Sequence, residues 1–220
     1  MRQTITLQTY KMTLGDKILG ATPLEFEQDI KPKMRYLVAH TNCLMSAAKE
    51  ADTEGDWFEF GVYSGKTLEF LTTLKDKVYG FDSFEGLPEE WNEHNEKGKF
   101  DTQGVPPFEP NEKMELVIGW FDETLPKFLN EIKIERVSLL HLDADLYSST
   151  KCVFDNMKPY FSKQCVLVFD EFFNYPEWEY HEYKAFKEFL NQMEDKIEDV
   201  EYLGFSDTRY HPAAFKVIFK

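Results

Sequence analysis

Short apolar segments alternate with helix-like stretches along most of this chain, and that alternation restricts the fold more than any other feature. The apolar segments span residues 57–62, 77–82, 114–119, 137–143 and 164–170. Helical patterns follow four of them, over residues 66–74, 122–132, 148–157 and 178–193. Strands that alternate with helices are joined by right-handed crossovers, so they lie parallel in one sheet. Because these strands are apolar throughout, we expect helices on both faces of that sheet.

The two ends of the chain differ from this pattern. Residues 199–205 and 213–219 are strand-like with no helix between them, so they predict an antiparallel pair. We therefore expect an α/β, doubly wound, mostly parallel seven-stranded sheet with a C-terminal antiparallel hairpin. Residues 1–54 are expected to be irregular and helical, with one helix over 34–48. We predict that this segment belongs to the same domain as residues 55–220 and contacts substrate or a second copy in a homodimer.

Composition narrows the function. The 220 residues include 40 Asp and Glu against 25 Lys and Arg, a net charge of −15. A surface this acidic should bind neither nucleic acid nor an anionic membrane. The three cysteines form no CxxC pair, which favours free thiols in a reducing compartment. No apolar run approaches the roughly 18 residues of a membrane span, and residues 1–20 lack a signal-peptide core, so we expect a cytoplasmic protein.

A glycine turn follows the first apolar segment, where a parallel sheet binds its ligands. Gly61 and Gly65 allow the backbone to pass close to a ligand, but their spacing lacks the extra glycine of a pyrophosphate-binding turn. Asp82 follows Gly61 by 21 residues and ends the next strand, where an acid can accept hydrogen bonds from both ribose hydroxyls. The pattern predicts an adenosine ligand without a diphosphate, with Glu59 facing a cationic part of it.

Four acids end the two later strands of the predicted sheet. They are Asp143, Asp145, Asp170 and Glu171. Buried like charges are costly unless something compensates them, and carboxylate oxygens favour magnesium, calcium or manganese. The alternative is that they cap helices or face water, and Asp145 in particular is placed to cap the helix that begins near Ser148. Residues 83–113 lack periodicity, which is typical of a substrate loop.

Four ordered motifs then resemble one known family. They read FEFGVYSG over 58–65, FDSFEGLP over 81–88, GWFDETLP over 119–126 and HLDADLYSST over 141–150. Together they resemble the macrocin O-methyltransferase-like family of class I S-adenosylmethionine-dependent methyltransferases, over residues 56–190. The resemblance implies a Rossmann-like fold and transfer of a methyl group to a hydroxyl of a small molecule, such as a sugar or natural product, with help from a divalent metal.

The resemblance also implies roles for individual residues. The methionine part of S-adenosylmethionine would contact the first motif, the ribose Asp82 with its neighbours, and the adenine the start of the third motif. The cofactor residues are Glu59, Gly61, Tyr63, Ser64, Gly65, Asp82, Ser83, Phe84, Trp120, Phe121 and Asp143. Asp143, Asp170 and Glu171 would bind Mg²⁺, although the family usually has Asp at the position of Glu171. Asp143 would also act as the base.

Other interpretations remain open at this level. The same acids would suit a metal-dependent phosphate-handling enzyme, although the chain lacks a glycine-rich phosphate loop with Lys-Ser/Thr. A non-catalytic cofactor-binding module is a third possibility. We expect His141 to be a core histidine and His181 to lie on a helix surface. Tyr147 suits either packing or a ligand contact, as does the aromatic cluster of 172–173 and Trp178. Residues 89–91 are expected to be solvated.

Overall fold

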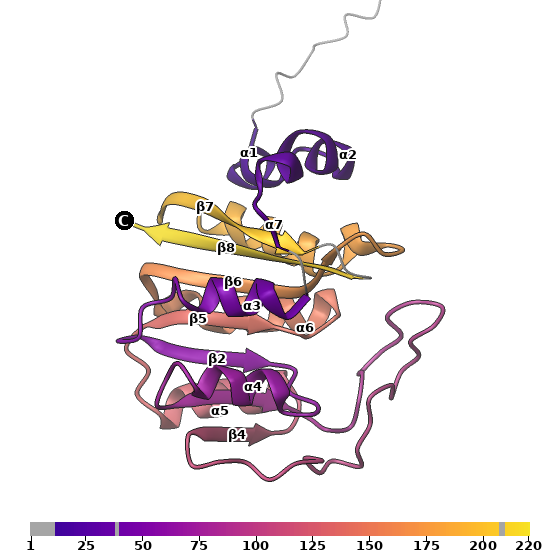
Figure 1. Cartoon of the computed structure of the whole chain (residues 1–220), viewed down its shortest axis with the longest axis vertical. Coiled ribbons are helices and arrows are strands. Elements are labelled where there is room, and N and C mark those ends of the chain that lie inside the picture. Colours follow the sequence, from indigo (N-terminus) through magenta and orange to yellow (C-terminus); the bar gives the residue numbers. More distant parts are fainter. Residues whose placement is uncertain (1–11, 38–39, 207–209) are drawn as a thin grey trace, which may run out of the picture.

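The computed structural model describes residues 12–37, 40–206 and 210–220. The described residues form one eight-stranded sheet in the order β1-β7-β8-β6-β5-β2-β3-β4 (Figure 1). The strands are β1 (Tyr36–Leu37), β2 (Asp56–Phe60), β3 (Val78–Asp82), β4 (Met114–Ile118), β5 (Val137–Leu142), β6 (Phe161–Phe173), β7 (Ile197–Ser206) and β8 (His211–Phe219). Strands β2 to β6 are mutually parallel.

The C-terminal pair confirms the predicted antiparallel hairpin. Strand β8 pairs antiparallel with both β6 and β7, and so lies between them. Every residue of β5 is buried, as are most residues of β2 and β3, which accounts for their lack of a polar face. The predicted fold class is therefore confirmed, apart from the short additional strand β1.

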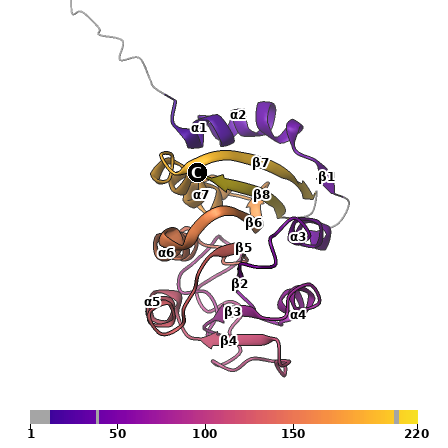
Figure 2. The same ribbon diagram turned by 90° about the vertical axis from the view of Figure 1, so that its left-hand side faces the viewer.

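Helices cover both faces of the sheet. Figure 2 shows α5 (Phe121–Glu131) and α6 (Tyr147–Met157) on one side, and α3 (His40–Ala48) and α4 (Lys66–Thr72) on the other. Helix α7 (Glu182–Gln192) packs beside α6. The sheet thus separates two clusters of buried apolar side chains, the larger of which includes residues of α5, α6 and α7.

The N-terminal segment departs from the prediction. We expected one helix over 34–48, but β1 occupies its first turn and pairs in parallel with β7, so only α3 remains helical. Ahead of β1 lie α1 (Leu14–Leu19), α2 (Pro23–Glu25) and the short turns η1 (Phe26–Ile30) and η2 (Lys31–Lys33). Helix α1 packs on α7, where Asp16 pairs with Lys187 at 2.9 Å.

Aromatic side chains attach this N-terminal segment to the rest of the core. The buried ring of Phe26 lies 5.3 to 5.9 Å, between ring centroids, from those of Phe172, Phe173, Trp178 and Tyr183. The cluster that we considered as a substrate wall is therefore core packing. Trp178 belongs to the turn η4 (Trp178–Tyr180), and the remaining short turn is η3 (Lys158–Tyr160).

The long connection between β3 and β4 has no named helix or strand, as its composition predicted. It extends to the right in Figure 1 and folds back on itself through a bridge between Glu85 and Asp101. The three cysteines are free thiols. Among the described residues, we find no helix with both the length and the apolar character needed to cross a membrane.

Candidate active site

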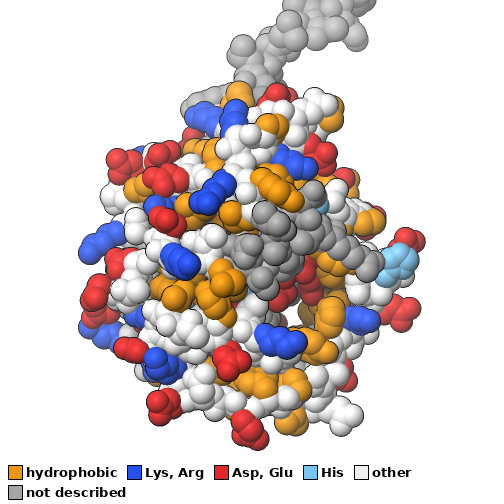
Figure 3. Space-filling view, viewed as in Figure 1, with side chains coloured by type: hydrophobic (Ala, Val, Ile, Leu, Met, Phe, Trp, Pro, Cys, Tyr) orange, Lys and Arg blue, Asp and Glu red, His pale blue; other side chains and the backbone are white. Residues whose placement is uncertain are grey.

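A cavity of about 620 Å³ opens at the carboxyl ends of the parallel strands. It is bounded by the ends of β2, β3, β5 and β6, by the first turns of α5 and α6, and by residues 86–100 of the long loop. In the space-filling view a recess lies to the right of centre with acidic side chains inside it (Figure 3). This is the edge at which an open parallel sheet binds its ligands.

The turn after β2 requires glycine at position 61. Gly61 has φ of 89°, and a Cβ built on it would lie 1.8 Å from the carbonyl oxygen of Asp143. The turn is fixed from both neighbouring strands, because the Gly61 amide donates to Phe81 O and the Asp143 amide donates to Phe60 O, each at 2.9 Å. The backbones of β2 and β5 therefore meet directly at the floor of the cavity.

Asp82 is held by the same turn. Its Oδ2 accepts hydrogen bonds from the amides of Val62 and Tyr63, both at 2.8 Å, and its Oδ1 accepts one from the Phe84 amide at 2.7 Å. Sequence reasoning predicted a ribose contact and did not anticipate these three bonds. Asp82 lines the cavity, and since a carboxylate offers about four acceptor positions, one remains for a ligand hydroxyl.

Aromatic side chains border this half of the cavity. Trp120 and Phe121, at the start of α5, line it, and the Phe121 ring meets that of Phe60 edge-on at 5.3 Å between centroids. Tyr63 is half exposed, and its ring lies 5.6 Å from that of Phe100. Ser83 also lines the cavity. The structure thus brings these predicted cofactor residues to one cavity, and their contacts with a cofactor stay predictions.

Four predicted cofactor residues lie elsewhere: Glu59, Ser64, Gly65 and Phe84 are absent from the described lining. The Phe84 ring is buried against Phe108, and a Cβ on Gly65 would meet that same Phe108 ring at 2.6 Å. Glu59 is fully buried inside the sheet. The contacts of these four residues with a cofactor, like those of the lining residues, stay predictions.

Glu59 belongs to a buried chain of polar groups beneath the cavity. Its carboxylate accepts a hydrogen bond from Thr67 Oγ1 at 3.0 Å and contacts His141 Nδ1 at 2.9 Å. His141 Nε2 lies 3.6 Å from Asp170 Oδ1. Burial lowers the pKa of His141, but the Asp170 and Glu59 carboxylates outweigh it and raise that pKa well above 6.5. His141 is therefore in the core, as predicted, and its ring lies between Glu59 of β2 and Asp170 of β6.

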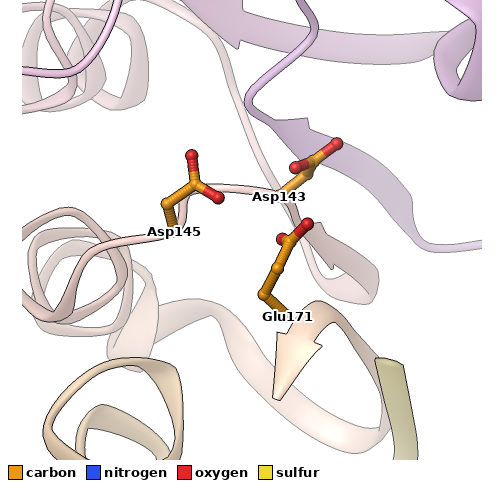
Figure 4. Close-up of side chains that lie close together, drawn as sticks. All are labelled: Asp143, Asp145 and Glu171. Atoms are coloured by element: carbon orange, nitrogen blue, oxygen red, sulfur yellow. The ribbon is translucent and has the colours of Figure 1, made fainter. Parts of the chain in front are cut away.

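Three carboxylates converge between the cavity and the buried polar groups Glu59, His141 and Asp170. One oxygen each from Asp143, Asp145 and Glu171 lies within 4.8 Å of the others, and Figure 4 shows the three side chains directed into a common space. The predicted metal set was Asp143, Asp170 and Glu171, so the structure includes Asp145 in the group and leaves out Asp170, which faces His141. Asp145 does not cap α6, because the N-cap residue is Leu146, which has no side-chain cap bond.

The convergence of these acids has electrostatic consequences. Burial and the neighbouring Asp170 and Asp82 carboxylates raise the pKa of Asp145 to about 8, although a hydrogen bond with Glu171 opposes the shift. Burial, followed by the Asp170 carboxylate, also raises the pKa values of Asp143 and Glu171 well above their ordinary range. Glu171 Oε2 is buried with no hydrogen-bond partner in the described structure. The group would be stabilised by a cation.

A fifth acid, Glu182 at the start of α7, was missed by sequence reasoning. Its side chain is fully buried, and neither carboxylate oxygen has a hydrogen-bond partner among the described residues. Burial and the carboxylates of Asp145, Asp143 and Asp170 raise its pKa well above the usual value, while the Ala144 amide opposes the shift. No sequence signal distinguishes Glu182 from the exposed acids of the same helix.

The opposite wall of the cavity is aromatic. Trp91 and Tyr210 line it, with ring centroids 5.4 Å apart, and Trp91 also packs against Tyr175 and His181. We expected residues 89–91 to be solvated; that is wrong for Trp91, which is buried because these rings enclose it. His181 is likewise half-buried at the N-cap of α7 rather than on a helix surface.

Tyr147 and the N-terminal segment were also considered as ligand contacts. Tyr147 is outside the described lining: its hydroxyl donates to Glu188 at 2.8 Å and Lys184 lies over its ring, so it packs on α7. The N-terminal segment also contributes nothing to that lining over its described part, residues 12–37 and 40–54. Its described part packs on α7 and β7, and its predicted contact with substrate or with a second copy stays a prediction.

Comparison with known proteins places this cavity in context. A family model described as a methyltransferase domain matches residues 58–172. The 8-demethyl-8-(2,3-dimethoxy-α-L-rhamnosyl)-tetracenomycin-C 4'-O-methyltransferase of Streptomyces olivaceus is 26% identical over an alignment of 146 positions, and the match covers 54% of this chain and 53% of that protein. The match therefore spans about half the length of this curated relative.

Solved structures share the fold. CalS11, a calicheamicin methyltransferase, superposes with a TM-score of 0.59 at 24% identity over 91% of this chain and 88% of that one. A second structure of CalS11, described as a TDP-rhamnose 3'-O-methyltransferase, gives 0.53 at 22% identity over 91% and 90%. An O-methyltransferase from Bacillus cereus, in complex with SAH, gives 0.51 at 11% identity over 96% and 93%.

Proposed function

This chain belongs to the methyltransferase domain family, and from that premise we propose that it transfers a methyl group from S-adenosylmethionine to a hydroxyl of a small molecule. The observation that carries the proposal is the joint placement of the Gly61 turn, Asp82 and the acids of β5 and β6 around one cavity. The S. olivaceus relative is named for methylating a sugar hydroxyl, and a sugar or natural product is accordingly the acceptor class that we propose here.

S-adenosylmethionine would bind at the β2 and β3 side of the cavity and supply an electrophilic methyl group. The Gly61 turn would let its backbone approach the ligand, and Asp82 would accept from a ribose hydroxyl with its remaining acceptor position. Trp120 and Phe121 would lie against the adenine. We retain Glu59 only as a support for this side, since its carboxylate is already bonded to Thr67 and His141.

A divalent cation fits the acidic side of the cavity. The three converging carboxylates and the unpartnered Glu171 Oε2 form an all-oxygen donor set of the kind that Mg²⁺ prefers. We propose Asp143, Asp145 and Glu171 as its ligands, with Asp170 positioned by His141 at their edge. Bound there, Mg²⁺ would lower the pKa of an acceptor hydroxyl.

The remaining chemistry belongs to the side chains of this chain. A carboxylate within the group, for which we propose Asp143, would take the proton from the acceptor hydroxyl. Asp143 follows β5 and lines the cavity, so its carboxylate is within the space where the acceptor hydroxyl would bind. The walls from Trp91 and Trp120 would exclude water and hold the hydroxyl in line with the methyl group.

Cofactor selectivity tests the proposal first. Calorimetry with S-adenosylmethionine, SAH and NAD should show binding of the first two and none of NAD, since the turn lacks the glycines that accommodate a pyrophosphate. Tight NAD binding without a response to S-adenosylmethionine would overturn the methyltransferase assignment.

Metal dependence needs a separate experiment. Methyl transfer is measured after exhaustive chelation, with and without added Mg²⁺, once an acceptor is in hand. Asp145→Asn should reduce transfer sharply and leave SAH affinity nearly unchanged, while Glu171→Asp should retain activity because the shorter carboxylate is still a ligand. Full activity of the chelated enzyme would remove the metal from the reaction.

A further inference from the structure

Aromatic rings from two distant segments meet at the opening of the cavity on its β2 and β3 side. Tyr63 belongs to the turn after β2 and Phe100 to the long loop between β3 and β4, and both line the cavity. Their rings meet at an angle of 62°, with 5.6 Å between centroids. Tyr63 is 49% exposed and Phe100 is 40% exposed. The pair is therefore an apolar surface that faces both the cavity and water.

Both residues have an unfavourable backbone conformation. The angle φ is 43° at Tyr63 and 71° at Phe100, in the left-handed region that bulky side chains seldom adopt. Such conformations persist where surrounding contacts impose them, and they concentrate at functional sites. Eight of the described non-glycine residues have a positive φ, and three of these, Tyr63, Phe100 and Asp145, are among the 24 that line the cavity. Strained positions are thus more frequent in the lining than elsewhere.

Hydrogen bonds within the long loop impose the conformation of Phe100. The Leu87 amide donates to the carbonyl oxygen of Lys99, and the Thr102 amide donates to that of Phe84, each at 2.9 Å. These bonds join the two arms of the loop on either side of Phe100. The fold therefore fixes the position of the Phe100 ring before any ligand binds.

Packing alone does not account for this arrangement. Phe84 also has a positive φ, of 56°, but its ring is buried and contacts Phe108. The described contacts of the Phe100 ring are the edge of Tyr63 and the Lys99 ammonium, 5.8 Å from the ring centroid. Because these contacts leave much of the ring in water, its strained conformation is better explained by a contact with a ligand.

The location of the pair indicates which ligand it contacts. The Tyr63 amide donates to Asp82 Oδ2 at 2.8 Å, so its ring begins beside the carboxylate to which we assign the ribose. A ribose can present its hydroxyls to this carboxylate and its C–H groups to a ring. Contact with the pair would remove apolar surface from water, which favours the bound state.

We propose, building on the proposed function, that Tyr63 and Phe100 form an aromatic cover that contacts the ribose end of bound S-adenosylmethionine or SAH and slows its release. Phe100 is then a cofactor-binding residue from outside the four sequence motifs, contributed by the long loop. Because the two rings are already in place, the contact costs little ordering of side chains. The cofactor must break the contact in order to leave.

The release of tritiated SAH, after a chase with excess unlabelled SAH, measures this contact. Phe100→Ala should release SAH about fivefold faster than the wild type, as expected if the cofactor covers the exposed 40% of the ring. Gln103→Ala is the matched control, because Gln103 has a similar φ of 63° in the same loop but is outside the described lining. It should leave the rate unchanged. Equal rates for Phe100→Ala and the wild type would overturn the proposal.

Two further variants separate the ring contact from other effects. Phe100→Leu keeps a large apolar side chain without the flat ring, so it serves if urea denaturation shows that Phe100→Ala does not fold. It should also release SAH faster than the wild type. Tyr63→Phe removes only a hydroxyl and should not change the rate. Faster release from Tyr63→Phe would show that the hydroxyl makes the contact, which contradicts an aromatic cover.

Protection of Tyr63 in the unsubstituted protein is an independent test. Tetranitromethane nitrates accessible tyrosines, and Tyr36 and Tyr180, which are exposed and outside the described lining, are internal controls. SAH should slow the nitration of Tyr63 and leave that of the other two unchanged, as measured by mass spectrometry of peptides. Equal nitration of Tyr63 with and without SAH would also overturn the proposal. Failure of the proposed function is distinguishable, because the wild type would then show no SAH binding in calorimetry.

Discussion

The two sides of the cavity differ in how their carboxylate side chains are stabilised. On the β2 and β3 side, the Asp82 carboxylate accepts three backbone hydrogen bonds from the turn and the loop that it joins. On the β5 and β6 side, Asp145 and Glu171 face further acids, and Glu171 Oε2 has no described partner. The hydrogen bonds of the first side are therefore complete within the fold, whereas we propose that a positively charged ligand completes the second. The first side shapes the cavity, and the second is the one to which we assign the proposed metal and base.

A substitution in the turn after β2, on the β2 and β3 side, should have the largest effect on the free energy of unfolding. Gly61→Ala would place a methyl group 1.8 Å from the Asp143 carbonyl oxygen at a φ of 89°. The backbone conformation and the overlap together should cost about 3 kcal/mol or more of unfolding free energy. Urea denaturation measures that loss, and calorimetry should show that SAH binding is lost with it.

Gly98→Ala is the control for that substitution. Gly98 has a similar φ of 81°, but a Cβ on it would meet nothing within 4 Å. We expect a cost of about 1 kcal/mol, from the backbone conformation alone. Equal costs at the two positions would show that the contact between the β2 turn and Asp143 is not what fixes the floor of the cavity.

The fold was predictable from sequence because its signals are local and repeated. The buried strands lack polar faces. The absence of a helical pattern between residues 199–205 and 213–219 predicted the antiparallel pair. The strand β1 was missed because two residues carry too little pattern to interrupt an apolar periodicity that suits a helix. It forms because β7 offers a free edge, which is a tertiary effect that local sequence does not encode.

The site was predictable where a residue follows a strand and unpredictable where the fold brings in distant segments. Asp82, Asp143 and Glu171 were found from their positions at strand ends. Glu182 was missed because it joins them from the start of α7, and Trp91 because its loop has no periodicity. Glu59 was predicted to face a cationic part of the ligand from the glycine-turn pattern, and the resemblance implied the same, yet its carboxylate contacts His141 inside the sheet.

A smaller change tests how far Asp82 is structural. Asp82→Asn keeps the side-chain shape but turns one acceptor into a donor that faces a backbone amide. We expect a loss of about 2 kcal/mol of unfolding free energy, with weaker SAH binding in addition. Asp76→Asn, at an exposed acid just before β3 that pairs with Lys113 at the surface, is the control and should cost no more than about 0.5 kcal/mol and leave SAH binding unchanged. If Asp82→Asn weakened SAH binding with no loss of stability, the three backbone bonds would not be stabilising the turn.

The smallest effect on stability is expected on the β5 and β6 side. There the substitution should stabilise the protein, whereas the substitutions above destabilise it. Burial raises the pKa of Glu182, so as the pH rises the unfolded chain ionises first and the folded chain loses stability until its own carboxyl ionises. Glu182→Gln removes this loss. In chelated protein the variant should match the wild type in stability near pH 4.5 and be more stable than it at pH 8. Urea denaturation at the two pH values measures the difference, with Glu198→Gln, an exposed acid of β7, as the control that should show none.

Added Mg²⁺ should narrow the gap in stability between wild type and the Glu182→Gln variant, because a cation compensates the same charge. A Glu182→Gln variant that is less stable than the wild type at pH 8 would mean that this carboxylate has a partner in the folded protein, and the contrast between the two sides of the cavity would then not extend to α7.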